Sequence, residues 1–373
     1  MNFINKTALL TVTSLLLSSL LLSNSVWASD EYVPLKSGEH AVGGVLTTTY
    51  QVDNQPLDNT EYLYSIDLDL TVQFDGWGAY GWLEYARSTD AKSVTNRFEN
   101  TNADAGTAVD KQGKGRAQLS EFYLYGNTDS EGNHGWKVGL SEVTTLVDTS
   151  AIANEEVSQF LSLELVNNMT ISFPDYALSA MVQDLSWNGH ENFGYRLVAS
   201  SSHGVQDSTD PDEIDKIQSY TELFDVTAKD KGVFGAGELL FKTKVYEANV
   251  GYWHNSGSNA SANWGLYSGV DYFSDVGNFN LRYGWASAQK EQAEQFYSIA
   301  YQRDIAGGTL AGGYTLTRFN QADDVHHLEV YYRKELSDKV FVTPMVQWAS
   351  GMTLGDWDET NYWLFGLRLE FWM

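Results

Sequence analysis

The stretch YWLFGLRLEF, residues 362–371 near the end of the chain, alternates between two kinds of side chain. In an extended strand, successive side chains point to opposite faces. One face carries Trp363, Phe365, Leu367, Leu369 and Phe371, and the other carries Tyr362, Leu364, Gly366, Arg368 and Glu370. The first face suits lipid and the second suits water, and a tilted strand needs about nine to eleven residues to cross a bilayer. The stretch therefore predicts a transmembrane β-strand.

The same period of two recurs near the beginning of the chain. Residues 62–74 place Asp67 and Asp69 regularly between aliphatic side chains, which a helix would not do. The dipeptide Asp75-Gly76 follows directly and is typical of a tight hairpin turn. Together with residues 77–85, this region predicts two antiparallel strands.

Alternation of this kind predicts about sixteen strands in all. They are expected at residues 40–51, 62–74, 77–85, 116–126, 135–141, 172–183, 193–203, 232–242, 244–255, 262–275, 277–288, 294–304, 309–319, 325–336, 339–349 and 362–372. Brief links alternate with long ones, the longest being residues 89–115, 142–171 and 204–231. Short turns at one end and long loops at the other are typical of a bacterial barrel, whereas a β-sandwich would not need them. The predicted fold is an all-β, transmembrane antiparallel β-barrel.

The amino terminus has the composition of an export signal. Lys6 precedes an apolar run over residues 8–22, and Ala28 stands before the acidic residues Asp30 and Glu31. This order of charge, apolar core and small residue is typical of a cleaved signal peptide. A single membrane helix is the alternative, but the run is short and no stop-transfer pattern follows it. We expect residues 1–28 to be removed and residues 29–373 to form one barrel domain.

The overall composition excludes several classes of protein. The chain has no cysteine, so it does not depend on disulfides. Its formal net charge of -26 is unfavourable for binding nucleic acid. Aromatic residues make up 14% of the chain although its mean hydropathy is -0.32. That combination fits a wall with an apolar outside, aromatic belts and a hydrated inside.

The link between the fifth and sixth expected strands differs from the other long links. Residues 142–171 are not uniformly polar, because they contain Ile152, Val157, Phe160, Leu161, Leu163, Leu165 and Val166. A loop this apolar is unfavourable in water. Folding it into the lumen would bury these side chains against the wall and narrow the pore. We therefore predict an inward-folded constriction loop between strands 5 and 6.

Several short runs in this region carry a family resemblance. They lie within residues 139–148, 151–161, 166–171 and 173–178, and include Asn154-Glu155, Gln159-Phe160, Asn167-Asn168 and Phe173-Pro174-Asp175. On these runs, and on a similar hairpin over residues 238–254, the chain resembles the carbohydrate-selective porins of the OprB type. The resemblance implies a barrel in the bacterial outer membrane that passes mono- and oligosaccharides through a water-filled channel.

The resemblance also implies partners. An aromatic-ended final strand is similar to the assembly signal of outer-membrane barrels, although Trp372 and Met373 follow Phe371 where Phe usually ends the chain. The implied partners are the barrel assembly machinery, outer-membrane lipid and lipopolysaccharide, with sugars as permeating solutes. A homo-oligomer is compatible with the resemblance. The acid-rich residues 207–231 fit either a solvated surface loop or divalent-cation bridges to lipopolysaccharide.

Sugars are polyols with apolar ring faces, so a selective pore needs aromatic rings for stacking and polar groups for hydrogen bonds. Strand parity places the aromatic side chains Tyr80, Trp82 and Trp253 in the lumen. We expect an acidic rim at Glu142, Asp148, Glu155 and Glu156, amide partners at Asn154 and Gln159, and a basic wall at Arg196, Arg282, Arg333 and Arg368. The alternative for each charge is a structural role, through pairing across neighbouring strands. The acid excess predicts a preference for cations over anions.

Three other functions are alternatives to a sugar channel. A non-specific diffusion porin would share the fold without discriminating among sugars. A barrel enzyme would need a catalytic site, but the sequence contains no Gly-x-Ser-x-Gly or His-Glu-x-x-His motif. A surface adhesin would use the long acidic loops and would lack a conducting lumen. We expect no enzymatic activity, no cofactor and no metal site.

Overall fold

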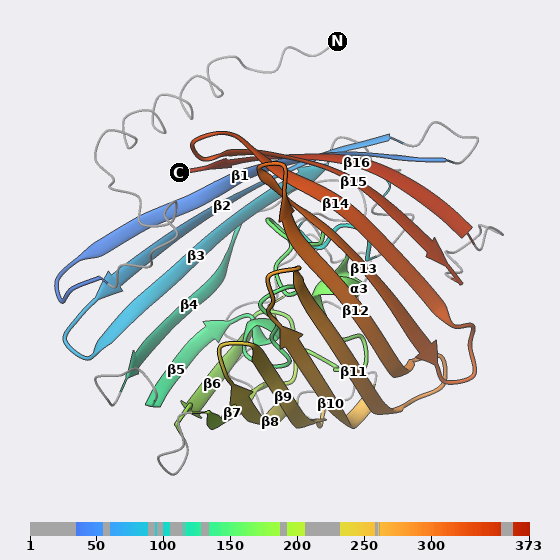
Figure 1. Cartoon of the computed structure of the whole chain (residues 1–373). Helices are drawn as coiled ribbons and strands as arrows, with labels where there is room; N and C mark the ends of the chain where they lie inside the picture. Colours follow the sequence, from blue (N-terminus) through green and yellow to red (C-terminus); the bar gives the residue numbers. More distant parts are fainter. Residues whose placement is uncertain are drawn as a thin grey trace.

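The computed structural model describes residues 35–54, 60–88, 94, 100–104, 115, 117–127, 134–186, 192–205, 232–257, 260, 262–351 and 361–373. Sixteen strands run in chain order around a closed barrel (Figure 1). They are β1 (His40–Asp53), β2 (Thr60–Gln73), β3 (Trp77–Ser88), β4 (Ala117–Asn127), β5 (His134–Ser141), β6 (Ala177–Asp184), β7 (Phe193–Ser201), β8 (Val233–Lys242), β9 (Tyr246–Asn255), β10 (Ala262–Tyr272), β11 (Asn278–Ala288), β12 (Ala293–Ile305), β13 (Gly308–Phe319), β14 (Val325–Ser337), β15 (Val340–Ser350) and β16 (Asn361–Trp372).

The barrel closes between its first and last strands. β16 pairs antiparallel with β1, from Val45 opposite Trp372 to Asp53 opposite Leu364. On its other side β16 pairs with β15. Figure 1 accordingly shows the red C-terminal strand beside the blue N-terminal strand. Closure removes free sheet edges from the wall, so its backbone N–H and C=O groups are paired without water.

β16 has the two faces that its alternation predicts. Trp363, Phe365 and Leu367 are 42%, 50% and 42% exposed on the outside. An apolar exterior of this kind is stable only in lipid, which confirms the predicted transmembrane barrel. On the inside, Arg368 and Glu370 are fully buried. The expectation that this face is wet is wrong for these two residues: a loop covers Arg368 from within, and Glu370 is enclosed by its contacts with Arg333, Arg368 and Trp372.

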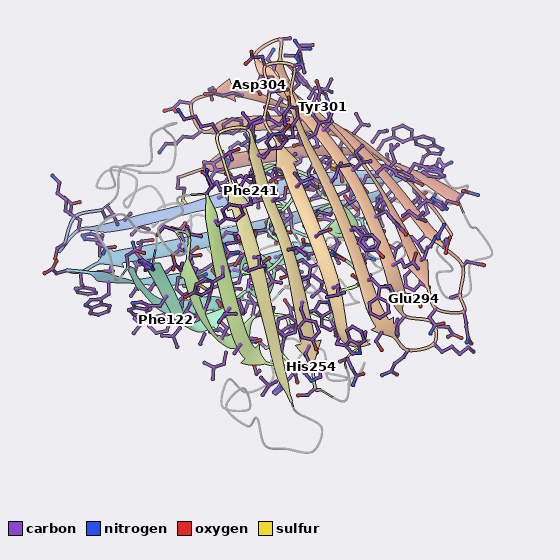
Figure 2. All side chains as sticks on the ribbon, turned by 60° about the horizontal axis from the view of Figure 1, so that its bottom comes forward. Phe122, Phe241, His254, Glu294, Tyr301 and Asp304 are labelled. Atoms are coloured by element: carbon purple, nitrogen blue, oxygen red, sulfur yellow. The ribbon has the colours of Figure 1, made fainter. Side chains whose placement is uncertain are left out.

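Aromatic rings form rows near both ends of the outer wall. The row at the end with short turns consists of Tyr246, Tyr272, Phe279 and Tyr301. The row at the other end includes Tyr314, His326, Trp348 and Trp363. Figure 2 shows Tyr301 near Asp304 at one end of the barrel, and His254 toward the opposite end. Such rows are typical of the two membrane–water interfaces.

Short turns join strands at one end, as predicted. The turn between β2 and β3 contains Gly76 with a φ of 78°, a left-handed conformation that glycine adopts without strain. Several predicted bounds differ from the structure by one to three residues, and the largest difference is at β6, which begins at Ala177 and not at residue 172. The reason is that Pro174 has no N–H for the ladder and that the Phe173 N–H already donates to the Ile171 carbonyl at 2.8 Å.

Two short helical segments, Val143–Thr145 and α3 (Leu163–Val166), lie in the link between β5 and β6. Among the described residues, no helix combines the length and apolar character needed to cross a membrane. The expected signal peptide, residues 1–28, and the acid-rich residues 207–231 lie outside the described part of the chain.

Candidate functional site

Residues 142–176, which we call the inner loop, connect β5 to β6 and run inside the barrel outline in Figure 1. Its apolar side chains form two buried clusters with wall residues. The first cluster joins Val143, Leu146, Val147 and Ile171 to Val198, Phe234, Trp253 and Tyr267. The second joins Ile152, Phe160, Leu161 and Leu165 to Ala300, Ala311, Tyr331 and Met345. The apolar residues of the loop are therefore removed from water by the wall between β7 and β15.

Wall carboxylates accept hydrogen bonds from the backbone of the inner loop: Glu121 of β4 accepts from the Glu142 N–H at 2.7 Å, and three more lie farther along the wall. Glu238 bonds to the N–H of Asp148, Asp271 to that of Ala151, and Glu329 to those of Leu161 and Ser162, at 2.8, 2.7, 2.9 and 2.8 Å. An irregular loop leaves such N–H groups without a ladder partner, and a buried N–H needs one. The carboxylates supply these partners and so fix the loop against β8, β10 and β14.

Three wall arginines do the same for the loop carbonyls. Arg196 donates to Leu146 at 3.0 Å, Arg282 to Leu165 and to Val166 at 3.1 Å, and Arg368 to Glu156 at 2.6 Å and Gln159 at 3.0 Å. We expected these arginines to face the solute as a basic wall. The structure instead buries Arg282 and Arg368 beneath the loop. Buried guanidinium groups need several acceptors, and the irregular loop backbone provides them.

Arg333 is separate from the other three arginines. It lies near the turn end of β14, where its Nη2 is 2.7 Å from a carboxylate oxygen of Glu370. Its guanidinium stacks over the ring of Phe341, 3.7 Å from the centroid. Glu370 is also 3.5 Å from the Nε of Arg368. The expected basic wall is therefore split, and Glu370 lies between Arg333 and Arg368.

Asp148 is buried where the inner loop bonds to Glu238 of β8. Its carboxylate accepts a hydrogen bond from the Asn168 side chain at 2.9 Å. Burial raises the pKa of Asp148 to about 7, although Arg282 and the Asn168 hydrogen bond act in the opposite direction. Asp148 therefore holds two parts of the inner loop together. It has the structural role that was the alternative to the expected position on the acidic rim.

Glu155, Asn154 and Gln159 shape a turn in the inner loop. The Glu155 carboxylate accepts from the Val157 N–H at 2.8 Å and also bonds to the Ser158 hydroxyl. The Gln159 side chain accepts from the Asn154 N–H at 3.0 Å and donates to the Ala151 carbonyl at 3.0 Å. Each of these side chains is half-buried, so the turn presents an amide and a carboxylate that are already oriented.

Glu142 and Glu156 approach one another on the side of the loop that faces β2 to β4. Burial raises the pKa of Glu142 to about 7, and repulsion by Glu121 and Glu84 adds to the rise. Burial also raises the pKa of Glu156 well above its usual range, with further contributions from Glu142, Glu155 and Asp104. Such mutual repulsion requires proximity, so the two predicted rim residues belong to one acidic cluster.

Asp104 belongs to this cluster and was not expected from the sequence. Its carboxylate accepts from the Ser65 hydroxyl at 3.0 Å, and its burial raises its pKa to about 7. The segment 100–104 also joins the inner loop, because the Ala103 N–H donates to Leu161 at 2.8 Å. The segment lies in a polar link without hydrophobic periodicity, so no signal in the sequence marked it as buried.

The three predicted lumen aromatics have different surroundings. Tyr80 stacks on Tyr123 with centroids 5.0 Å apart. The Trp82 indole donates to Asp67 at 3.2 Å, and the ring is half-buried. Trp253 points inward but is fully buried in the first cluster. It therefore differs from the expectation of a ring open to solutes, because the inner loop covers it.

Comparison with known proteins agrees with this geometry. No family model matches the chain. A protein of Aquifex aeolicus (strain VF5), named only as uncharacterized, is 22% identical over 331 residues, covering 88% of this chain and 89% of that protein. The high-pH structure of Pseudomonas putida OprB has a TM-score of 0.65 at 11% identity, covering 90% of this chain and 94% of that one. A mutant of the Rh. blastica porin has a TM-score of 0.54 at 13% identity, covering 89% and 100%. The chain therefore has the porin fold.

Proposed function

We propose that the protein is an outer-membrane porin through which carbohydrates diffuse, and that it prefers cations to anions. The inner loop acts as the constriction. In this proposal mono- and oligosaccharides are the permeating solutes, and the C-terminal strand is read by the barrel assembly machinery. Contacts with lipopolysaccharide and a homo-oligomeric state belong to the same proposal. The likeness to porins supports a channel rather than an enzyme.

One observation carries the proposal. Most hydrogen bonds that fix the inner loop lie on the wall between β7 and β16. On the wall from β2 to β6 the loop bonds to Glu84 and Glu121, and half-buried aromatic rings such as Tyr80 and Trp82 remain. A path along that wall offers ring faces for stacking and carboxylates such as Asp67 for hydrogen bonds. Weak contacts of both kinds suit a polyol that must enter and leave. The acidic cluster around Glu142, Glu156 and Asp104 supports the cation preference.

Liposome swelling tests the proposed function. Proteoliposomes are exposed to pairs of sugars of equal mass and different stereochemistry, and to a neutral polyol of similar size that is not a sugar. We expect sugars to enter faster than the other polyol and to differ from one another. Equal rates for all solutes would make the protein a non-specific diffusion porin, and absence of swelling with every solute would reject a channel.

A further inference from the structure

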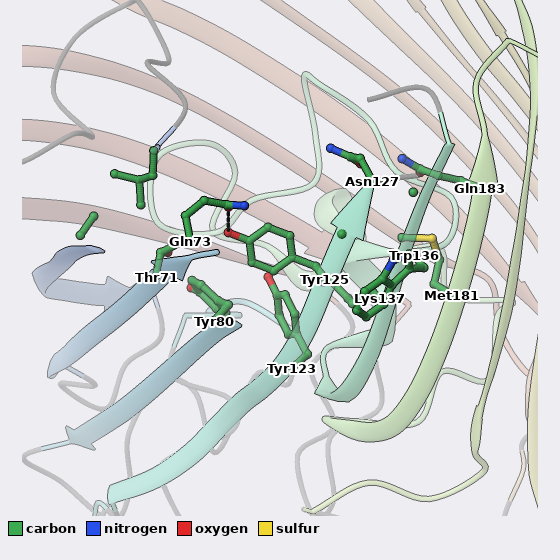
Figure 3. Close-up of a pocket in the computed structure, with 14 residues that line it drawn as sticks. Thr71, Gln73, Tyr80, Tyr123, Tyr125, Asn127, Trp136, Lys137, Met181 and Gln183 are labelled. Atoms are coloured by element: carbon green, nitrogen blue, oxygen red, sulfur yellow. Dashed lines mark hydrogen bonds between the residues drawn. The ribbon is translucent and has the colours of Figure 1, made fainter. Parts of the chain in front are cut away.

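A second inward-facing region lies where β2 to β6 approach the short turns. A cavity of about 340 Å³ opens there, lined among others by Tyr80, Tyr123, Tyr125, Lys137 and Gln183. Figure 3 shows the three tyrosines, from β3 and β4, directed toward the same space. The volume lies at the low end of the range for small-molecule pockets, about 300–1,000 Å³, so it suits a ligand of one or two rings.

Tyr80, Tyr123 and Tyr125 pack against one another at an angle, and we call this group of three side chains the tyrosine corner. Tyr80 and Tyr123 are stacked with an angle of 28° between their planes. Tyr125 stands at 67° to Tyr123, with centroids 6.2 Å apart. The Lys137 ammonium lies 3.8 Å from the centre of the Tyr123 ring. Tyr123 is therefore engaged by both Tyr80 and Lys137, and Tyr125 lines the cavity beside it.

Gly78 positions the Tyr125 ring. The two residues are opposite one another in the ladder between β3 and β4. A Cβ at Gly78 would lie 2.5 Å from Cζ and from the hydroxyl oxygen of Tyr125. The Tyr125 hydroxyl donates to the Gln73 side chain at 3.1 Å, as the dashed line in Figure 3 shows. The tip of the ring therefore lies against the backbone of β3. A larger residue at position 78 would clash with the ring and displace it.

A neighbouring cavity provides a contrast. It also measures about 340 Å³, and the described residues that line it include Arg196, Lys242, Glu247 and Asp271 and no tyrosine. The tyrosine corner has Lys137 as its cation, and this ammonium is attracted by the buried carboxylate of Glu121. The corner therefore presents ring faces and hydrogen-bonding groups without an uncompensated charge, which favours a neutral ligand.

We propose that the tyrosine corner is a binding subsite for one pyranose ring of a neutral sugar. This inference rests on the proposed function and adds a location to it. The apolar face of the sugar stacks on Tyr125, and hydroxyl groups at the edge of the sugar bond to Lys137 and Gln183. Stacking of an apolar face and hydrogen bonding at the rim is the combination that polyol rings require.

Sugar block of ion current tests the subsite. Single reconstituted channels are recorded in KCl while glucose or maltose is titrated, and block is normalised to each variant's own sugar-free current. Tyr125→Leu removes the ring, and Gly78→Ala displaces it. We expect both to raise the half-blocking sugar concentration several-fold, up to about tenfold. Tyr125→Phe, which retains the ring, should stay close to the parent.

Tyr283→Leu is the matched control, because Tyr283 is 38% exposed on the outer face of β11. It makes the same chemical change away from the lumen, and its half-blocking concentration should equal that of the parent. Unchanged block in both Tyr125→Leu and Gly78→Ala would overturn the subsite while leaving the sugar channel intact. A parent channel that conducts ions but does not discriminate among solutes in the swelling assay would overturn the proposed function instead.

Discussion

The wall beneath the inner loop and the wall from β2 to β6 follow the same strand geometry but meet different surroundings. Beneath the loop, Arg282 and Glu329 point inward and bond to backbone groups. On the other wall, Tyr125 and Lys137 also point inward, yet they line a cavity. Strand parity therefore says which side chains face inward. Whether an inward side chain meets a solute depends on what covers it.

The largest effect should come from removing an anchor beneath the loop. Glu329→Leu takes away the acceptor of the Leu161 and Ser162 N–H groups. Leaving a buried N–H without its acceptor costs about 1–3 kcal/mol, and two such groups lose their partner here, so the loop should detach from β14. We expect a higher single-channel conductance and faster cutting by a glutamyl endopeptidase at Glu155 and Glu156. Trypsin is unsuitable, because residues 142–176 contain no Lys or Arg.

The control for this change is Glu335→Leu, which makes the same substitution at an exposed position of β14. It should leave both conductance and cleavage rate as they are in the parent. Parental behaviour of Glu329→Leu would mean that the two apolar clusters hold the loop without help from the carboxylates.

A smaller effect is expected from pH at the acidic cluster. Burial raises the pKa of Asp104 and of Glu142 to about 7. Both groups are therefore mostly protonated below pH 7 and become charged above it. Cation preference, measured as the reversal potential in a KCl gradient, should grow as the pH rises through 7 and fall as it drops.

Asp104→Asn combined with Glu142→Gln should flatten this pH dependence. If the double variant keeps the parental change of reversal potential between pH 6 and pH 8, the cluster does not lie on the ion path.

The smallest effect should come from an exposed ion pair beside the short turn between β8 and β9. Lys242 and Glu247 are 2.5 Å apart, but their side chains are 70% and 35% exposed. Exposed pairs contribute about 1 kcal/mol or less, so Lys242→Gln should scarcely change the thermal unfolding midpoint in detergent. Arg196→Gln should lower the midpoint clearly, because Arg196 holds both Glu238 and the Leu146 carbonyl. Equal shifts of the unfolding midpoint for the two variants would contradict the expected difference between buried and exposed ion pairs.

The strands were readable from the sequence because period-two alternation is a local property. The alternation over residues 363–371 correctly predicted the lipid face of β16. Asp75-Gly76 correctly predicted the turn between β2 and β3. The early start expected for β6 failed where Pro174 interrupts pairing. The number and order of strands followed from the whole set, since each strand alone is a weak signal.

The candidate site was only partly readable. The apolar residues of the inner loop indicated burial, and parity placed the arginines inside. Neither could show that Arg368 bonds to a carbonyl 212 residues earlier in the chain. The burial of Asp104 likewise depends on contacts with Ser65 and not on its own neighbours in sequence. Such contacts are properties of the closed barrel, and a linear pattern does not record them.

The use of Arg368 as an anchor links the position of the inner loop to the closure of the barrel. Arg368 lies on β16, the last strand of the chain, and holds the carbonyls of Glu156 and Gln159. These two carbonyls obtain their partner only when the final strand has taken its place. Because β16 also pairs with β1, the strand that closes the wall is the strand that holds this part of the inner loop, so barrel closure and loop fixation are coupled.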